Sequence, residues 1–121
     1  MRISEASTAC GLSPDTIRYY EKSGMIPAVG RTQNGHRHFT PEIIDWLTLL
    51  YWLRKTGMPM EKMKRFTELA QQGDNTIETR RKILADHSRE LRSRRDELDR
   101  CEQVLAGKIG SYDKLLSERT S

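Results

Sequence analysis

The 121-residue sequence lacks the features that define several large classes of protein. It has no apolar run of roughly 18 or more residues that could cross a bilayer, and its first residues lack the apolar centre of a signal peptide. We therefore expect a cytoplasmic protein with no membrane partner. Its two cysteines, Cys10 and Cys101, lie far apart and in no metal-ligand spacing. We expect free thiols, no metal site and no other cofactor.

Patterns typical of catalysis are also missing. The sequence offers no Gly-rich phosphate loop, no paired acid and base, and no nucleophile with a nearby histidine, so an enzyme is not expected. Only 36% of the residues are hydrophobic, whereas 31% are charged. This balance favours thin helices with solvated outer faces over one deep core.

The net charge of +4 is concentrated toward the N-terminus. Residues 1–72 contain ten Lys and Arg against seven Asp and Glu, and residues 73–121 contain eleven against ten. A mildly basic balance permits a nucleic-acid partner without proving one. Residues 73–121 would have to bury their apolar side chains against something else, most simply a second chain.

Two short helices are predicted at the start of the chain. Residues 2–10 form the first, which Gly11 ends. Ser13 as the N-cap and Pro14 at the first helical position predict a second helix over residues 14–22. Two helices of this length joined by a Gly-containing turn are typical of a helix-turn-helix.

A hairpin and two longer helices follow. Residues 31–39 read as a hairpin, because both turn positions at Asn34 and Gly35 suit positive φ. Further helices are expected between Thr40 and Gly57, with Thr40 as the cap, and from Pro59 to Gly73.

The last part of the chain changes to a seven-residue period. One apolar row repeats without a break: Ile77, Leu84, Leu91, Leu98, Leu105 and Tyr112. The second row of the same heptad is largely polar: Arg80, His87, Arg94, Cys101, Lys108 and Leu115. One clean row predicts a long helix that pairs with a single neighbour. Because Gly107 and Gly110 weaken its far end, the helix is not expected to extend much past Leu105.

Four motifs in this order carry a resemblance to a known family. The motifs are Thr16-Ile17-Arg18-Tyr19-Tyr20-Glu21, Gly24-Met25-Ile26-Pro27, Gly35-His36-Arg37-His38-Phe39 and Thr56-Gly57-Met58-Pro59. Together they resemble the MerR family of transcription regulators, and most closely its short redox- and aldehyde-responsive members, which act in stress responses.

The resemblance implies a mainly α fold with two parts. Residues 1–72 would form a winged helix-turn-helix DNA-binding domain with a small β-hairpin wing. Residues 73–121 would form a dimerisation helix, arranged as an antiparallel coiled coil in a homodimer, and a short C-terminal tail. The dimer would bind double-stranded promoter DNA and distort an overlong promoter spacer, so that RNA polymerase can use it.

The DNA-binding residues are expected on the second helix, the wing and the end of the following helix. Arg18 is the strongest candidate for a base or phosphate contact, whereas Tyr19 and Tyr20 are either phosphate donors or packing residues. His36 stands where the family usually has tyrosine, and Arg37 is central to the wing by resemblance. The full set is Thr16, Arg18, Tyr19, Tyr20, Lys22, Arg31, Asn34, Gly35, His36, Arg37 and Arg54. The dimerisation set is Ile77, Leu84, Leu91, Leu98 and Leu105.

The chain departs from the redox-responsive pattern at Trp52, near which those relatives carry a reactive cysteine. Thiol sensing at that position is therefore not expected. Trp46 and Trp52 read as core and junction packing, with an effector-sensing role for Trp52 as the alternative. Cys10 reads as a small buried side chain. Cys101 is either inert or a redox switch.

Two other functions fit some of these features. A helical adaptor could use the same helices to dock a protein partner without DNA, but it would have no reason to array cations on the hairpin. A small enzyme would need a catalytic group, and the sequence supplies no candidate for one.

Overall fold

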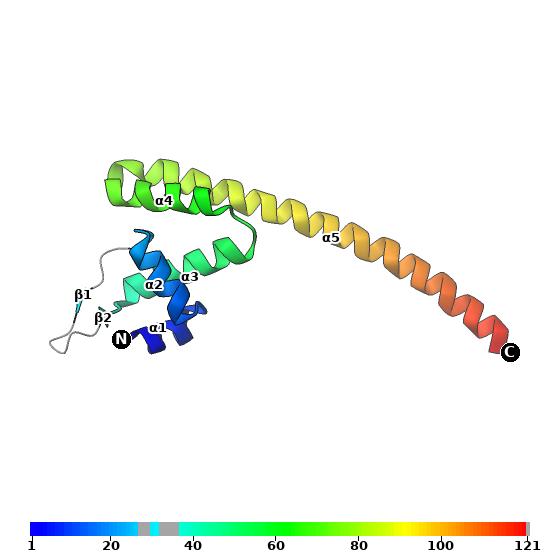
Figure 1. Cartoon of the computed structure of the whole chain (residues 1–121). Helices are drawn as coiled ribbons and strands as arrows, with labels where there is room; N and C mark the ends of the chain where they lie inside the picture. Colours follow the sequence, from blue (N-terminus) through cyan, green and yellow to red (C-terminus); the bar gives the residue numbers. More distant parts are fainter. Residues whose placement is uncertain (27–29, 32–36, 121) are drawn as a thin grey trace. The chain divides into compact units, whose positions relative to one another are not determined.

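The computed structural model describes residues 1–26, 30–31 and 37–120, with side chains for all of these except 30, 31 and 37 (Figure 1). The chain divides into two units, Met1–Ile83 and Leu84–Ser121. We call these unit 1 and unit 2. One helix, α5 (Ile77–Thr120), crosses the boundary between them.

Unit 1 begins with the two predicted short helices, α1 (Ile3–Cys10) and α2 (Pro14–Lys22). α1 ends at Gly11, which has a φ of 89°. A Cβ added at Gly11 would lie 3.2 Å from the ring of Tyr51. Glycine suits this position for two reasons, because it adopts positive φ readily and leaves room for the ring.

Two longer helices complete the frame of unit 1. α3 (Pro41–Lys55) begins at Thr40, whose Oγ1 accepts a hydrogen bond from the backbone N–H of Ile43 at 3.2 Å. α4 (Met60–Gln72) follows, and a short 3₁₀ helix, η1 (Asp74–Thr76), leads into α5. α1 packs against both α2 and α3, and α3 packs against α4. The two helices predicted for this stretch, between Thr40 and Gly57 and from Pro59 to Gly73, are confirmed as α3 and α4 to within a few residues at their ends.

The core of unit 1 draws on all four helices and the segments between them. Its fully buried members include Ala6, Ile17, Met25, Phe39, Leu47, Leu50, Met58 and Met63. Trp46 also packs here: its ring stacks on that of Phe66 with the centroids 5.3 Å apart. The indole N–H of Trp46 donates to the carbonyl of Met25 at 2.8 Å. The predicted packing role of Trp46 is confirmed.

Trp52 was predicted to pack in the core and at the domain junction; the core part is wrong for the described chain, and the junction part stays a prediction. Its side chain is 56% exposed, although its ring meets that of Tyr51 edge to face at 5.0 Å. The reason is its place on the helix. Leu47, Leu50 and Leu53 recur at three-residue intervals and take the buried face of α3, which leaves Trp52 on another side.

Two short strands lie between α2 and α3. β1 (Gly30–Arg31) pairs antiparallel with β2 (Arg37–His38), with Arg31 opposite Arg37. The turn predicted at Asn34–Gly35 lies outside the described residues, as does His36, so the hairpin wing remains a prediction. Beyond β2, the N–H of Phe39 donates to the carbonyl of Met1 at 2.9 Å.

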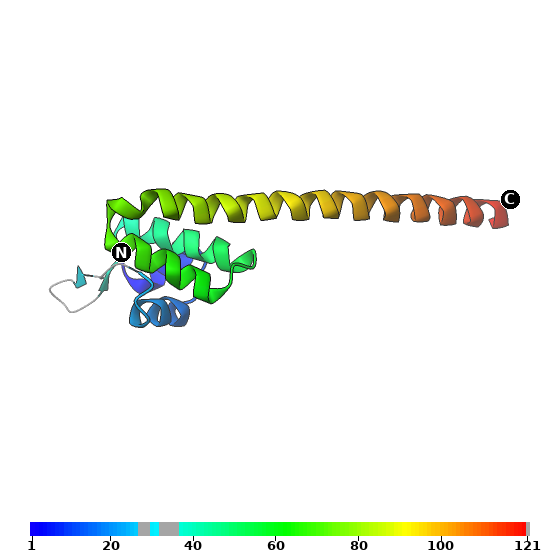
Figure 2. The same ribbon diagram turned by 90° about the horizontal axis from the view of Figure 1, so that it is seen from above.

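The expectation that the last helix ends soon after Leu105 is wrong. α5 continues to Thr120 as one unbroken helix (Figure 2). Each interior glycine costs about 1 kcal/mol relative to alanine. Gly107 and Gly110 are surrounded by good helix formers, and extending an existing helix is much easier than starting one. Although α5 is long, no helix in the described part of the chain is both long and apolar enough to span a membrane.

The far part of α5 carries apolar side chains beside the row of Leu105 and Tyr112. Ile109 and Leu116 are 57% exposed, and they alternate with Leu105 and Tyr112 at spacings of four, three and four residues. This spacing places all four side chains on one helix face. Ile109 and Leu116 therefore widen the apolar face in this part of the helix. The row from Arg80 to Leu115 is largely polar, as noted from the sequence, and its last member Leu115 is 54% exposed.

We expect Leu47→Ala to destabilise the protein by about 2–5 kcal/mol, because it leaves a cavity where a fully buried leucine stood. Urea unfolding followed by circular dichroism at fixed protein concentration measures this change. Asp45→Ala on the exposed side of the same helix is the control, and it should change the free energy of unfolding by less than about 0.5 kcal/mol. Equal effects of the two substitutions would contradict this description of the core.

Candidate nucleic-acid interface

Helix α2 has one buried and one exposed face. Ile17 is fully buried and Tyr20 is 2% exposed, so these two side chains attach the helix to unit 1, and Tyr20 has the packing role that was one of its two predicted roles. Arg18, Tyr19 and Lys22 are exposed. Polar and cationic groups therefore lie on the outer face of a helix whose inner face holds it in place.

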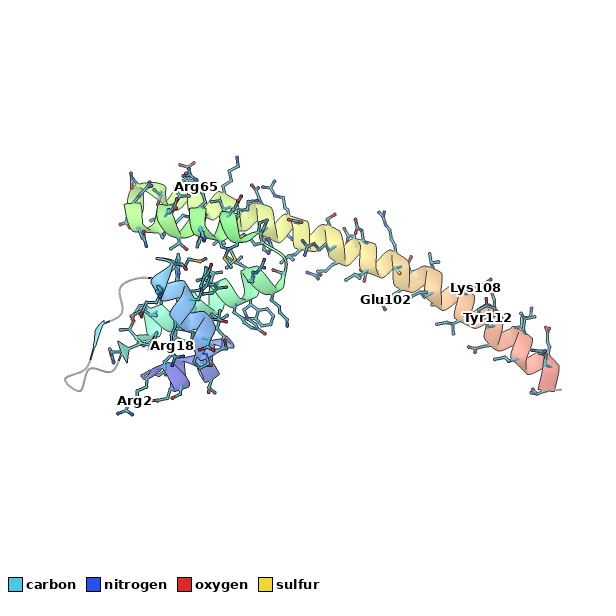
Figure 3. All side chains as sticks on the ribbon, viewed as in Figure 1. Arg2, Arg18, Arg65, Glu102, Lys108 and Tyr112 are labelled. Carbon is cyan, nitrogen blue, oxygen red and sulfur yellow. The ribbon has the colours of Figure 1, made fainter. Side chains whose placement is uncertain are left out.

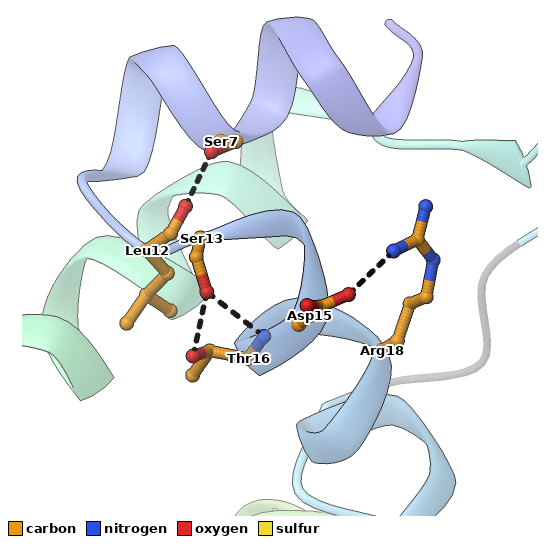
Figure 4. A network of polar contacts seen from close by, with 6 residues as sticks. All are labelled: Ser7, Leu12, Ser13, Asp15, Thr16 and Arg18. Atoms are coloured by element: carbon orange, nitrogen blue, oxygen red, sulfur yellow. Dashed lines mark hydrogen bonds and ion pairs between the residues drawn. The ribbon is translucent and has the colours of Figure 1, made fainter.

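The N-terminus of α2 is fixed by a small network of hydroxyl groups (Figure 4). Ser13 Oγ accepts the backbone N–H of Thr16 at 3.1 Å and lies 2.8 Å from Thr16 Oγ1. Just before the helix, the hydroxyl of Ser7 donates to the carbonyl of Leu12. The hydroxyl of Thr16 is thus already engaged in capping, which leaves its methyl group as the part free to make an apolar contact.

Arg18 forms an ion pair on the outer face of α2. Its Nη1 lies 2.9 Å from Oδ1 of Asp15, one turn earlier. The Asp15 side chain is 96% exposed and that of Arg18 is 54% exposed. Exposed pairs of this kind contribute little to stability. The pair instead sets the direction in which the guanidinium is held.

A hollow of about 380 Å³ lies between α2, the end of α3 and the start of α4. Three of the predicted residues on α2 and the predicted Arg54 on α3 line it together, although they are far apart in sequence. Its lining residues are Leu12, Thr16, Tyr19, Tyr20, Tyr51, Arg54, Lys55 and Met60. We call this the α2–α3 hollow.

Sequence reasoning missed three of these lining residues: Leu12, Tyr51 and Met60. Tyr51 belongs to the apolar pattern of α3, and this pattern indicates that the residue is buried. The pattern does not indicate that the Tyr51 ring reaches the end of α1. Only the tertiary packing of α1 on α3 brings it beside Gly11 and the hollow. Lys55, the neighbour of the predicted Arg54, lies in the same lining.

The electrostatics of the hollow act on Tyr20. Burial raises the pKa of its phenol above 10.0, because the phenolate is poorly solvated there. The positive charge of Arg54 opposes this rise, and Tyr19 adds to it. The effect of Arg54 on the phenol shows that residues from α2 and α3 share one electrostatic environment.

The remaining predicted residues lie elsewhere or outside the described part. Lys22 is exposed near the end of α2 and does not line the hollow. Arg31 and Arg37 lie opposite each other on the paired strands, and their side chains are outside the described set, as are Asn34, Gly35 and His36. In Figure 3, Arg65 on α4 lies on the opposite side of unit 1 from Arg18, away from this interface.

The predicted dimerisation residues lie along α5. Ile77, Leu98 and Leu105 are 53%, 62% and 54% exposed, whereas Leu84 and Leu91 are half-buried. Further along the helix, the ammonium of Lys108 lies 5.0 Å above the ring of Tyr112 (Figure 3). Of the two cysteines, Cys10 is buried as predicted and Cys101 is an exposed free thiol.

We expect part of the loss of stability at alkaline pH to come from Tyr20. Because its pKa is higher in the folded than in the unfolded protein, its contribution is present below about pH 10 and is lost as the pH rises through the folded value. Tyr20→Phe should flatten the fall in the free energy of unfolding above pH 10. Chemical denaturation between pH 8 and pH 11.5 measures it. With the exposed Tyr19→Phe as the control, an equal flattening in both variants would contradict the assignment.

Comparison with known proteins places this arrangement in a family. The family model described as "MerR family regulatory protein" matches residues 2–39, and that described as "MerR, DNA binding" matches residues 44–108. An uncharacterized HTH-type transcriptional regulator of Haemophilus influenzae is 37% identical over 111 residues, covering 92% of this chain and 82% of that protein.

Solved structures agree with this result. HiNmlR, a MerR family regulator that lacks the sensor domain and was crystallised bound to promoter DNA, is 37% identical. Its TM-score is 0.75, over 83% of this chain and 76% of that one. A MerR family regulator from Bacillus thuringiensis is 29% identical, with a TM-score of 0.69 over 88% and 96%. The chain described here belongs to the MerR family of transcription regulators.

Proposed function

We propose that this regulator binds promoter DNA as a homodimer, with α2 in the major groove and the α2–α3 hollow against the phosphate backbone. The observation that carries the proposal is the meeting of Tyr19, Arg54 and Lys55 around one hollow beside the exposed face of α2. Hydroxyl and cationic groups gathered in this way suit phosphate oxygens.

The exposed face of α2 suits the major groove, which is wide enough to admit an α-helix. The capped N-terminus puts the first turns of the helix in reach of base edges, as in other helix-turn-helix proteins. Arg18 would contact a base, and the methyl group of Thr16 suits the methyl group of thymine. Lys22, near the other end of the helix, would contact the backbone.

The α2–α3 hollow would receive a phosphate of the same duplex. Arg54 and Lys55 are both exposed, so their positive charge is available to a ligand. Tyr19 is 51% exposed, and its hydroxyl can donate to a phosphate oxygen. Tyr20 lines the hollow but is buried, so it supports the hollow and offers at most its hydroxyl.

The segment between α2 and α3 would act as the wing. Arg31 and Arg37 are opposite each other in the strand pair, which brings two cations to one short ribbon. Asn34, Gly35 and His36 would form its tip. A wing of this kind presses cations onto the backbone beside the groove that the helix occupies.

The α5 helices of two copies would pair antiparallel. The exposed row of Leu98, Leu105, Ile109, Tyr112 and Leu116 supplies an apolar face that needs a partner, and Ile77, Leu84 and Leu91 extend it toward the start of the helix. Residues 77–94 contain six Lys and Arg against three Asp and Glu, whereas residues 95–120 contain five against six. Antiparallel pairing places the basic part beside the slightly acidic part.

This arrangement would make residues 1–72 the DNA-binding domain and residues 73–121 the dimerisation element. The two DNA-binding domains would lie about one DNA turn apart, roughly 34 Å. Bending and untwisting a promoter costs of order a few kcal/mol, which phosphate contacts can supply. The distorted promoter would then be presented to RNA polymerase in the cytoplasm. HiNmlR, which was crystallised bound to promoter DNA, supports the promoter-binding part of this proposal.

We expect Arg54→Ala to weaken binding to every duplex by a similar factor, because it removes a phosphate contact and no base contact. The slope of log affinity against log salt concentration should become shallower by about 1. Fluorescence anisotropy with a labelled promoter duplex and an unrelated duplex, at several salt concentrations, measures both effects. Arg65→Ala, on the opposite side of unit 1, is the matched control. The assignment of the hollow fails if Arg54→Ala binds as the control does.

We expect Leu105→Asp to dissociate the dimer, because it places a charge in the apolar seam of α5. Sedimentation velocity at micromolar concentration distinguishes monomer from dimer. Gln103→Asp introduces the same charge at an exposed position on the other side of the helix, and it should remain dimeric. A wild-type monomer, or a Leu105→Asp dimer as stable as the control, would exclude this face as the interface.

A further inference from the structure

We infer that Asp15 is a specificity-determining residue, which makes α2 prefer a base with an exocyclic amine beside the guanine that Arg18 contacts. The inference rests on the proposed function, because it assumes that α2 enters the major groove. It starts from the ion pair between Asp15 Oδ1 and Arg18 Nη1, 2.9 Å long, on the exposed face of α2 (Figure 4).

A carboxylate is an unexpected group on a surface that faces DNA. The side chain of Asp15 is 96% exposed, so its charge would meet the phosphates with little shielding. The repulsion lowers affinity for every sequence unless the carboxylate finds a hydrogen-bond donor. In the major groove, the base edges that donate are the N4 amine of cytosine and the N6 amine of adenine. Every base pair carries one such amine, so an acid at this position favours the orientation that puts cytosine or adenine, and not guanine or thymine, on the strand that faces it.

The pairing leaves both residues able to bind bases. Arginine has five N–H donors, and the contact with Asp15 engages Nη1 alone, so other donors remain for O6 and N7 of guanine. An ionised carboxylate has about four acceptor sites, of which Arg18 occupies one. The ion pair thus places the guanidinium beside the carboxylate and leaves donors and acceptors available on both groups.

The spacing along the helix matches a base step. Asp15 and Arg18 are three residues apart, which puts them on the same face at a separation of about 4.5 Å along the axis. Adjacent base pairs are about 3.4 Å apart. Two side chains at this separation can reach neighbouring base pairs. The predicted element in each half-site is a guanine next to a base pair that presents cytosine or adenine amine to Asp15.

Two simpler roles for Asp15 give different results. In the first, Asp15, as the second residue of α2, stabilises the positive end of the helix and does nothing else. In the second, its charge repels every DNA sequence equally. Glu42 provides a matched control, because α3 begins with the same arrangement: Thr40 caps it, Pro41 is its first residue and Glu42 its second. Both helices have an acid in the first turn, and only α2 is proposed to read bases.

The test is selection of bound duplexes from a random pool, followed by sequencing, with the full-length wild type, Asp15→Ala, Asp15→Asn and Glu42→Ala. Melting temperatures of all four confirm folding. Asp15→Ala should lose the preference at one base pair of each half-site by about 5-fold to 150-fold, the range of a good base contact. It should keep the neighbouring guanine. Asp15→Asn should shift the preference toward adenine, which a carboxamide binds through N6 and N7.

The possible outcomes separate this inference from the proposed function. If Asp15→Ala selects the wild-type sequence, with affinity raised or lowered evenly for all duplexes, Asp15 does not determine specificity. The same conclusion follows if Glu42→Ala changes the selected sequence as much as Asp15→Ala does. If the wild type selects no sequence at all, the proposed function fails, and the inference fails with it. A selective wild type with an unchanged Asp15→Ala preference overturns the inference alone.

Discussion

The carbonyl groups just after α2 hold this helix against the rest of unit 1. The carbonyl of Met25 accepts hydrogen bonds from the indole of Trp46 on α3 at 2.8 Å and from the hydroxyl of Thr67 on α4 at 3.5 Å. One residue earlier, the carboxamide of Gln71 on α4 donates to the carbonyl of Gly24 at 3.0 Å. Side chains from α3 and α4, above all Trp46 and Gln71, thus fix the point where α2 ends, and leaving the part-buried carbonyl of Met25 unpaired would be costly.

The rest of the interface follows from this constraint. With the end of α2 held by α3 and α4, and Ile17 and Tyr20 buried behind it, the outer face of the helix can point in only one direction. The same packing brings the end of α3, with Arg54, to the side of α2 and so creates the α2–α3 hollow. A base-reading surface and a phosphate-binding surface are therefore consequences of one core.

The helix boundaries of unit 1 could be predicted from the sequence, because the residues that begin and end each helix act locally. Ser13 and Thr40 as caps, and Gly11 as a helix end, are readable because each satisfies backbone groups within a few residues. The candidate residues on α2 followed from the same local pattern and from the resemblance to the family. The gathering of Tyr51 and Met60 into the hollow could not be predicted, because it depends on contacts between helices that are distant in sequence.

The errors have physical causes as well. Gly107 and Gly110 suggested a helix end because their intrinsic propensity is low, but α5 is long enough to absorb both. Ile109 and Leu116, which continue the face of Leu105, lie outside the two heptad rows that were followed in the sequence. Trp52 was expected to pack together with Trp46, but the periodicity of α3 gives the buried positions to leucines.

The central claim is that two copies act together on one duplex, each presenting α2 to a major groove on the same side of the DNA. Native mass spectrometry combined with hydroxyl-radical footprinting, on one duplex recovered from the parent genome, tests it most directly. The account predicts two protein chains per duplex and two protected patches whose centres are about one helical turn apart, roughly 10 base pairs. One chain per duplex, a single protected patch, or no protection at all would contradict it.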